Sequence, residues 1–183
     1  MGGGDKPLLD VGGASMLARI LATLRPDHET IAISANGDPA RFAAFGLPVL
    51  PDGPFAGEGP LAGVCAGLAW AAERGAGALL TVPGDTPFIP GGLAAMLDPA
   101  PSCAASAGGV HHLVALWPVA AGPALRAWLA AGRPRRVAAF AAELGVRHVP
   151  IGTPGCDPFL NVNTQEDLAA ARATAHAPRR RPR

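Results

Sequence analysis

The chain has 183 residues, 49% of them hydrophobic and 16% charged, a composition typical of one compact globular domain. Its formal charge is +1, but four arginines lie among the last five residues, so the remainder carries 11 basic and 14 acidic residues. This balance argues against a basic nucleic-acid-binding face on the folded part. We expect one domain over residues 1–174, followed by a disordered Pro/Arg-rich tail over residues 175–183.

The cysteines and the apolar segments indicate in which cellular compartment the protein is expected. Three cysteines, residues 65, 103 and 156, lie far apart without a C-x-x-C pair, so their spacing predicts neither a disulfide framework nor a zinc site. Prolines and glycines interrupt the uncharged residues 99–125, which favours buried β structure over a membrane span. With no signal-peptide pattern at the start, we expect a cytoplasmic protein that binds neither membranes nor nucleic acid.

The first residues are rich in glycine. Three glycines follow Met1, and Lys6 lies just beyond them. Glycine lets backbone amides approach an anion closely, and a lysine neutralises phosphate charge, so Gly3 and Lys6 are candidates for phosphate binding. The P-loop pattern G-x-x-x-x-G-K-S/T is absent, and the alternative is a frayed terminus.

Two helices and one strand are predicted next. Apolar residues recur at helical spacing over residues 16–24, behind Ser15 as the N-cap. A strand over residues 30–34 is followed by Asn36, and a short helix over residues 39–45 comes after it.

A second strand and a glycine-rich loop follow. The strand over residues 48–52 ends in the carboxylate of Asp52. Pro60 suits the first position of a helix, and Gly59 before it leaves the amino end uncovered for an anion. Gly63 and Gly67, four residues apart, are interpreted as packing positions that let this helix approach the sheet closely.

The central stretch of the chain spans residues 78–88. Residues 78–82 form an uninterrupted apolar run, which is typical of a strand buried on both faces. Asp85 follows where the strand stops, and Pro87 prevents simple continuation. An ionised carboxylate beside apolar sequence calls for a cation, and Mg²⁺ is the hard cation that carboxylates commonly share with phosphates. The alternative is an Asp that merely caps a turn.

The remaining elements alternate in type. Helices are expected near residues 91–97, 123–131 and 137–144, and strands near residues 102–107, 112–117 and 146–150. Arg135 and Arg136 precede the last of these helices, and Asn161 and Asn163 lie in a turn before a final helix that a capping box at residues 164–167 opens.

This order predicts an α/β fold with a doubly wound, mostly parallel sheet. Ligands bind at the carboxyl ends of the strands in such sheets. Polar residues gather at those ends, namely Asn36, Asp52, Asp85, Asn161 and Asn163. Together they predict one site at one edge of the sheet.

Five segments in this order resemble the molybdenum cofactor guanylyltransferases, whose fold is a Rossmann-like nucleotidyltransferase domain. They are Gly3-Gly4-Asp5-Lys6, Gly59-Pro60-Leu61-Ala62-Gly63, Gly84-Asp85-Thr86-Pro87-Phe88, Gly132-x-x-Arg135-Arg136-Val137, and Asn161-Val162-Asn163-Thr164-x-Glu166-Asp167. The similarity extends from Met1 to about Ala173, so only the tail lies outside it.

The resemblance implies Mg²⁺-dependent transfer of GMP from GTP to the terminal phosphate of molybdopterin cofactor, with release of pyrophosphate. It implies that Asp85 holds the metal, that Lys6 contacts the triphosphate, and that Asn36 and Asp52 lie near the guanine nucleotide. It places Asn161 and Asn163, with Arg135 and Arg136, towards molybdopterin. Molybdoenzymes or their chaperones would be further partners.

Three departures from the family pattern stand out. The strand and Leu-Ala-Gly-Gly turn that precede the glycines in the family are absent, Ser34 replaces the first of two expected asparagines, and Leu113 follows His112 where proline is usual. The roles of His111 and His112 stay open. Because a doubly wound sheet needs its central strand, we expect the natural reading frame to start upstream of Met1.

Two other functions remain open at this point. One is a related transferase that uses CTP for the same cofactor, or that activates another phosphorylated small molecule. The other is a non-catalytic carrier that holds nucleotide or molybdopterin without turnover, which the missing glycine loop favours.

Overall fold

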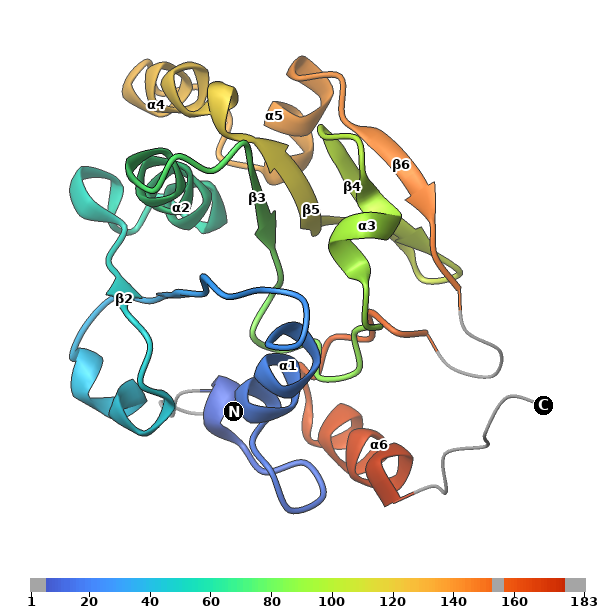
Figure 1. The fold of residues 1–183 in the computed structure, drawn as a ribbon. Coiled ribbons are helices and arrows are strands. Elements are labelled where there is room, and N and C mark those ends of the chain that lie inside the picture. The colour runs from blue at the N-terminus through green and yellow to red at the C-terminus, as the bar shows by residue number, and fades with distance from the viewer. Residues whose placement is uncertain (1–5, 153–156, 177–183) are drawn as a thin grey trace.

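The computed structural model describes residues 6–152 and 157–176, which form a four-stranded sheet, a separate pair of short strands, and helices on both faces of the sheet (Figure 1). The strands are β1 (Ile33–Ser34), β2 (Val49–Leu50), β3 (Ala78–Thr81), β4 (Ser102–Ser106), β5 (Gly109–Pro118) and β6 (Arg147–Pro150). The α-helices are α1 (Met16–Leu24), α2 (Pro60–Glu73), α3 (Leu93–Leu97), α4 (Gly122–Ala130), α5 (Val137–Glu143) and α6 (Gln165–His176). Short 3₁₀ helices are η1 (Lys6–Leu8), η2 (Pro39–Phe45), η3 (Gly53–Phe55) and η4 (Val119–Ala121).

The main sheet has the order β3-β5-β4-β6, and β5 runs antiparallel to both of its neighbours. β6 runs parallel to β4. The predicted α/β class is therefore confirmed, but the sheet is mixed rather than mostly parallel. The reason is the connection between β4 and β5: Ser106 pairs with Gly109, so only two residues join the strands, and a parallel pair would need a long crossover.

Two apolar clusters cover the two faces of the main sheet. On one face, α2, α4 and α5 pack against the sheet around Trp117 and Phe140, whose rings lie 6.3 Å apart. On the other face, α3 and Ile20 of α1 pack against Val114 and Leu116 of β5. The indole N–H of Trp117 donates to the hydroxyl of Thr81 at 2.9 Å, so the buried Trp117 has a partner for its one donor.

The glycines of α2 behave as the sequence predicts. The helix begins at Pro60, behind Gly59 with a φ of +80°. A Cβ atom at Gly67 would lie 2.9 Å from Leu79 of β3, and one at Gly63 would lie 2.6 Å from the Ser34 hydroxyl oxygen. A side chain at either position would therefore require Leu79 or Ser34 to move, so glycine permits the close approach of α2 to the strands.

β1 and β2 form a parallel pair that does not join the main sheet among the described residues. A cavity of about 1270 Å³ lies between them and β3, lined by residues 30–36 on one side and 78–84 on the other. β1 is shorter than the predicted strand over residues 30–34, because β2 is its one strand partner among the described residues. The proposed upstream strand stays a prediction.

The final helix begins with the predicted capping box. The backbone amides of Asn163 and Thr164 donate to Asp167 Oδ2 at 2.9 and 2.8 Å, and the amide of Asp167 donates to the Thr164 hydroxyl at 3.0 Å. α6 ends at His176, two residues inside the predicted tail, and the rest of that tail lies outside the described residues. None of the helices in the described part of the chain is long and apolar enough to cross a membrane.

We predict that native-state hydrogen exchange follows this pattern of strand pairing. β4 is bonded to strands on both sides, whereas β1 has one strand partner in the described part of the chain. The amides of Cys103 and Ala104 should therefore exchange at least ~10-fold more slowly than those of Ile33 and Ser34, as measured by NMR at neutral pH. Similar protection of the two strands would contradict this arrangement.

Candidate functional site

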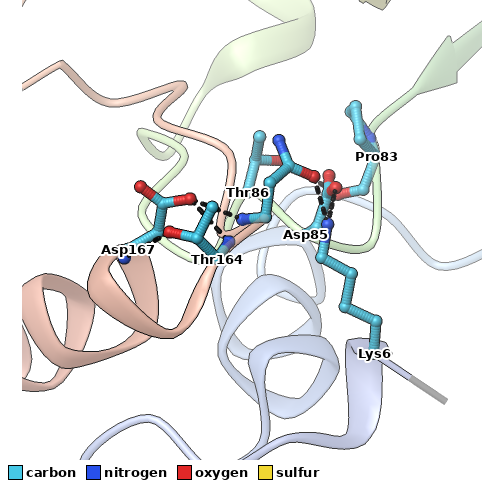
Figure 2. Close-up of polar contacts among 7 residues, drawn as sticks. Lys6, Pro83, Asp85, Thr86, Thr164 and Asp167 are labelled. Atoms are coloured by element: carbon cyan, nitrogen blue, oxygen red, sulfur yellow. Dashed lines mark hydrogen bonds and ion pairs between the residues drawn. The ribbon is translucent and has the colours of Figure 1, made fainter. Parts of the chain in front are cut away.

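The centre of the site is the side-chain amine of Lys6, which joins two segments far away in the sequence (Figure 2). Lys6 Nζ donates to Asp85 Oδ2 at 2.9 Å and also to the amide oxygen of Asn163. The Lys6 and Asp85 side chains are 28% and 23% exposed, so the ion pair is partly shielded but open to a ligand. Lys6 of η1 thus contacts Asp85 in the loop after β3, as expected for two residues of one site.

Local contacts fix the carboxylate of Asp85 in this place. Thr86, whose side chain is buried, donates its hydroxyl to the Pro83 carbonyl at 2.8 Å and so closes the turn that carries Asp85. The amide of Val162 donates to the Asp85 carbonyl at 2.9 Å. The loop before α6 is therefore bonded directly to the loop after β3.

The helix cap of α6 positions Asn163 in turn. Two backbone N–H groups, from Thr164 and Asn163, and the Thr164 hydroxyl lower the pKa of the Asp167 carboxyl. Ionised Asp167 thereby holds the backbone of Asn163, whose side chain accepts from Lys6. This places Asn163 beside Lys6, whereas the sequence grouped it with Arg135 and Arg136.

Asn36 and Asp52 form a second polar group, after β1 and β2. The Asn36 amide donates to Asp52 Oδ2 at 2.7 Å, and its oxygen accepts from the Asp52 backbone N–H at 2.9 Å. Both residues line the cavity between β1 and β3, together with Pro83 and Gly84. The two strand ends predicted to contribute to one site are therefore bonded to each other.

Arg135 and Arg136 line a neighbouring cavity of about 1230 Å³, which also contains Asp85 and Asn161. The two cavities share wall residues such as Gly59 and Pro60. They therefore form adjoining compartments, with Asp85 in the second.

The two arginines differ in their own contacts. Arg135 pairs with Glu58 at 2.5 Å and donates to the Leu129 carbonyl at 2.7 Å. Arg136 is exposed at the N-cap of α5. Arg135 therefore ties the loop before α2 to α4, in addition to facing the cavity.

His111 and His112 also line the second cavity, although the sequence left their roles open. The His111 ring lies 2.7 Å from the Ser106 hydroxyl, which donates to Asp157 at 2.7 Å, and its centroid lies 5.0 Å from that of Phe159. Burial lowers the pKa of the His112 imidazole, and the neighbouring His148 and His111 lower it further. These contacts join β5 to β4, to β6 and to the loop that contains Asp157 and Phe159, so the sequence alone could not predict them.

The donor set around Asp85 fits a hard cation. It consists of the Asp85 carboxylate and the amide oxygen of Asn163, which share Lys6 Nζ, and oxygen is the donor that Mg²⁺ takes. Asn161 lines the same cavity as Asp85. Asp85 would hold the ion, since one carboxylate plus substrate phosphates is a common arrangement for Mg²⁺. Gly3, the remaining candidate for phosphate binding, lies outside the described residues.

Comparison with known proteins decides the family. The profile of the MobA-like NTP transferase domain matches residues 1–149. The chain belongs to the MobA-like NTP transferase family. This confirms the resemblance found in the sequence and makes the chain a member of a nucleotidyltransferase family.

Relatives within this family are similar over most of their length. The molybdenum cofactor guanylyltransferase of Acidiphilium cryptum is 55% identical over 173 residues, which are 94% of this chain and 88% of that protein. The protein of the same name from Cereibacter sphaeroides is 51% identical over 175 residues, 93% of this chain and 88% of the relative.

Solved structures of MobA-like and other transferases share the fold. Molybdopterin-guanine dinucleotide biosynthesis protein A from Archaeoglobus fulgidus aligns with a TM-score of 0.72 at 19% identity, covering 94% of this chain and 91% of that one. The 2-C-methyl-D-erythritol 4-phosphate cytidylyltransferase of Thermus thermophilus aligns with a TM-score of 0.67 at 19% identity, covering 94% of both chains. At this identity the likeness concerns the fold alone.

The contacts of the two arginines predict different effects on stability. Arg135→Ala removes a partly exposed ion pair and a bond to a carbonyl, so we expect it to lower the free energy of unfolding by about 1 kcal/mol. Arg136→Ala should change it by less than about 0.5 kcal/mol, as for most exposed side chains. Urea denaturation of the two variants measures the difference, and equal losses would show that the Arg135 contacts are not structural.

Proposed function

We propose that this chain transfers GMP from GTP to the terminal phosphate of molybdopterin cofactor, with release of pyrophosphate and with Mg²⁺ as the cofactor. The observation that carries the proposal is the 55% identity, over 94% of the chain, to a molybdenum cofactor guanylyltransferase. The grouping of Lys6 and Asp85 beside two adjoining cavities supports it, because the reaction needs two phosphate-bearing substrates to meet at one point.

The nucleotide would occupy the compartment between β1 and β3. Pro7 and Gly84, the sequence neighbours of Lys6 and Asp85, line this cavity, so the triphosphate would extend from it towards that ion pair. Asn36 and Asp52 line its wall as contacts for the guanine nucleotide. Gly3 would add a backbone amide to the phosphates. In this assignment Asn163 is a positioning residue for Lys6, because its amide oxygen accepts from the amine.

Molybdopterin would occupy the second compartment. Arg136 would be the main phosphate contact, because it is exposed, whereas Arg135 is paired with Glu58. Arg135 and Asn161 line the same cavity. Guanidinium groups suit phosphate oxygens because their donors match a pair of acceptors. Asp85 lines this cavity, beside the residues that the two cavities share, so the acceptor phosphate can approach the nucleotide there.

The chemistry requires positioning and charge neutralisation more than covalent help. An oxygen of the acceptor phosphate attacks the α-phosphorus of GTP, and the bond from that phosphorus to the oxygen of pyrophosphate breaks. Lys6 offsets negative charge on the phosphates, and Asn163 holds its amine in place. When bound, Mg²⁺ neutralises phosphate oxygens as a Lewis acid.

One alternative is the same reaction at the same site with CTP in place of GTP. The solved cytidylyltransferase with a TM-score of 0.67 shows that this fold also serves CTP enzymes, so the fold does not select the nucleotide. The guanylyltransferase relatives favour GTP. We place the reaction in the cytoplasm, with molybdoenzymes or their chaperones as recipients of the product.

The direct test is turnover with Mg²⁺, molybdopterin cofactor and either GTP or CTP. We expect pyrophosphate and a guanine dinucleotide from GTP, with CTP at least ~10-fold less efficient in kcat/KM. A higher kcat/KM with CTP would contradict the proposal and identify the chain as a cytidylyltransferase. Retention of nucleotide and cofactor without pyrophosphate would show a carrier instead.

In the same assay, Asp85→Asn should lower turnover at least ~10²-fold, because the variant loses the charge that holds the metal. Asp27→Asn is the matched control, since Asp27 is an exposed carboxylate after α1 that bonds to the amide of Gly92. Near-normal Mg²⁺-dependent turnover of a folded Asp85→Asn protein would remove Asp85 from the metal site.

Arg136→Ala should weaken binding of molybdopterin cofactor about 10-fold or more and leave GTP binding within about 2-fold, because a charge-assisted phosphate contact contributes roughly 1.5–3 kcal/mol. Isothermal titration calorimetry with each ligand measures the two affinities. Arg133→Ala is the control, since Arg133 pairs with Glu143 and stacks on Trp128. Equal losses for both ligands would separate Arg136 from the acceptor compartment.

A further inference from the structure

Three side chains that bind transition metals converge on one face of the main sheet. Cys103 comes from β4, His112 from β5 and His148 from β6. One ligand atom from each lies within 4.8 Å of the other two. The proposed transfer reaction uses none of these three atoms.

The registers of the strands explain why the three meet. In the parallel pair of β4 and β6, Cys103 lies directly opposite His148. Between β4 and β5 the register shifts after Cys103: Cys103 pairs with Ala115, but Ala104 pairs with His111. Residues 112–114 of β5 therefore have no paired residue on β4, since they lie between the partners of Cys103 and Ala104. In this arrangement His112 Nδ1 lies 3.9 Å from Cys103 Sγ.

The donor set selects a class of metal. One thiolate and two imidazoles suit Zn²⁺ and related late transition-metal ions, whereas Mg²⁺ prefers oxygen. Three protein ligands leave the fourth position of a tetrahedral ion for water or another ligand. The set therefore differs in chemistry from the oxygen donors around Asp85.

The Cys103–His112 pair already lies near the separation that a metal ion requires, and the atoms of His148 lie within 4.8 Å of both. A tetrahedral zinc ion with bonds of ~2.3 Å to sulfur and ~2.05 Å to nitrogen sets sulfur and nitrogen ~3.6 Å apart. The Cys103–His112 distance of 3.9 Å is close to that value. His148 is exposed, so its ring can turn towards the other two ligands without disturbing the core.

A weak hydrogen bond from the Cys103 thiol to His112 is the simpler account of that single contact. It does not account for His148, whose ring centroid lies 5.8 Å from that of His112 in an edge-on arrangement. Cys103 is fully buried and His148 is exposed, so the ligands run from the core to the surface and leave a route for an ion.

We propose that Cys103, His112 and His148 bind one divalent transition-metal ion such as Zn²⁺, separate from the metal at Asp85. On binding, the thiol of Cys103 releases its proton to solvent and the two imidazoles coordinate in their neutral form. The ion would join the edge strand β6 to β4 and to the irregular part of β5. His112 also lines the cavity that contains Arg135 and Arg136, so the ion would brace one wall of that cavity.

Co²⁺ tests the proposal, because a thiolate ligand gives it a charge-transfer absorption that oxygen ligands do not. The full chain is treated with a chelator and titrated with Co²⁺ in the absence of nucleotide. We expect one equivalent to give a thiolate-to-cobalt band and tetrahedral visible bands, and Zn²⁺ to displace it. Absence of the thiolate band at saturating Co²⁺ would overturn the proposal.

Variants identify the ligands. Cys103→Ser should abolish the band, whereas Cys65→Ser, at another buried cysteine in α2, should keep it. His148→Gln should weaken Co²⁺ binding at least ~10-fold and His28→Gln should not. Since His148 is exposed, its variant tests the site even if Cys103→Ser fails to fold. Unchanged affinity in His148→Gln would overturn the three-ligand site, and an intact band in Asp85→Asn would separate this site from the magnesium site.

Discussion

The contact of the Lys6 amine with Asp85 and Asn163 is the interaction on which the candidate site depends. It joins side chains 79 and 157 positions apart from Lys6 in the sequence, so the beginning, middle and end of the described chain meet at one charge. Backbone bonds reinforce the junction, since Val162 is bonded to Asp85 and the α6 cap holds Asn163. A bound nucleotide would meet a cation already fixed by two acceptors, which reduces the loss of side-chain freedom on binding.

Local patterns let the sequence predict much of the fold. Pro60 after Gly59, the capping box of α6 and the apolar residues 78–82 each identify an element from its own residues. The prediction that residues 78–82 are buried on both faces is wrong for the described chain, because β3 lies at the edge of the main sheet, pairs antiparallel with β5 and has no buried residue. The direction of β5 could not be predicted in this way, because the two-residue connection is apparent only once the ends of β4 and β5 are known. The same limit applies to the site. Asp85 and Lys6 were identified by type and position, but the placement of Asn163 beside Lys6 rests on contacts between distant segments.

The adjacent residues His111 and His112 lie on opposite faces of the sheet and meet different partners. Successive side chains on a strand point to opposite faces of the sheet. His111 contacts Phe159, which packs in the cluster of α3, whereas His112 lies beside Cys103, which packs in the cluster of α2 and α4. The shift in register after Cys103 sets which partner each ring meets. Periodicity alone identifies the strand but not the irregularity, so the pair could not be interpreted from the sequence.

The arrangement of β1 and β3 has a consequence for the behaviour of the protein in solution. Unpaired strand edges offer backbone groups to any extended polypeptide, and natural sheets normally cover or charge them. Here two edges flank a cavity lined mainly by apolar residues such as Leu21, Ile33 and Leu80, without a strand between them in the described chain. An extended segment would therefore pair more readily with β1 or β3 than with β6, whose exposed residues include Arg147 and His148.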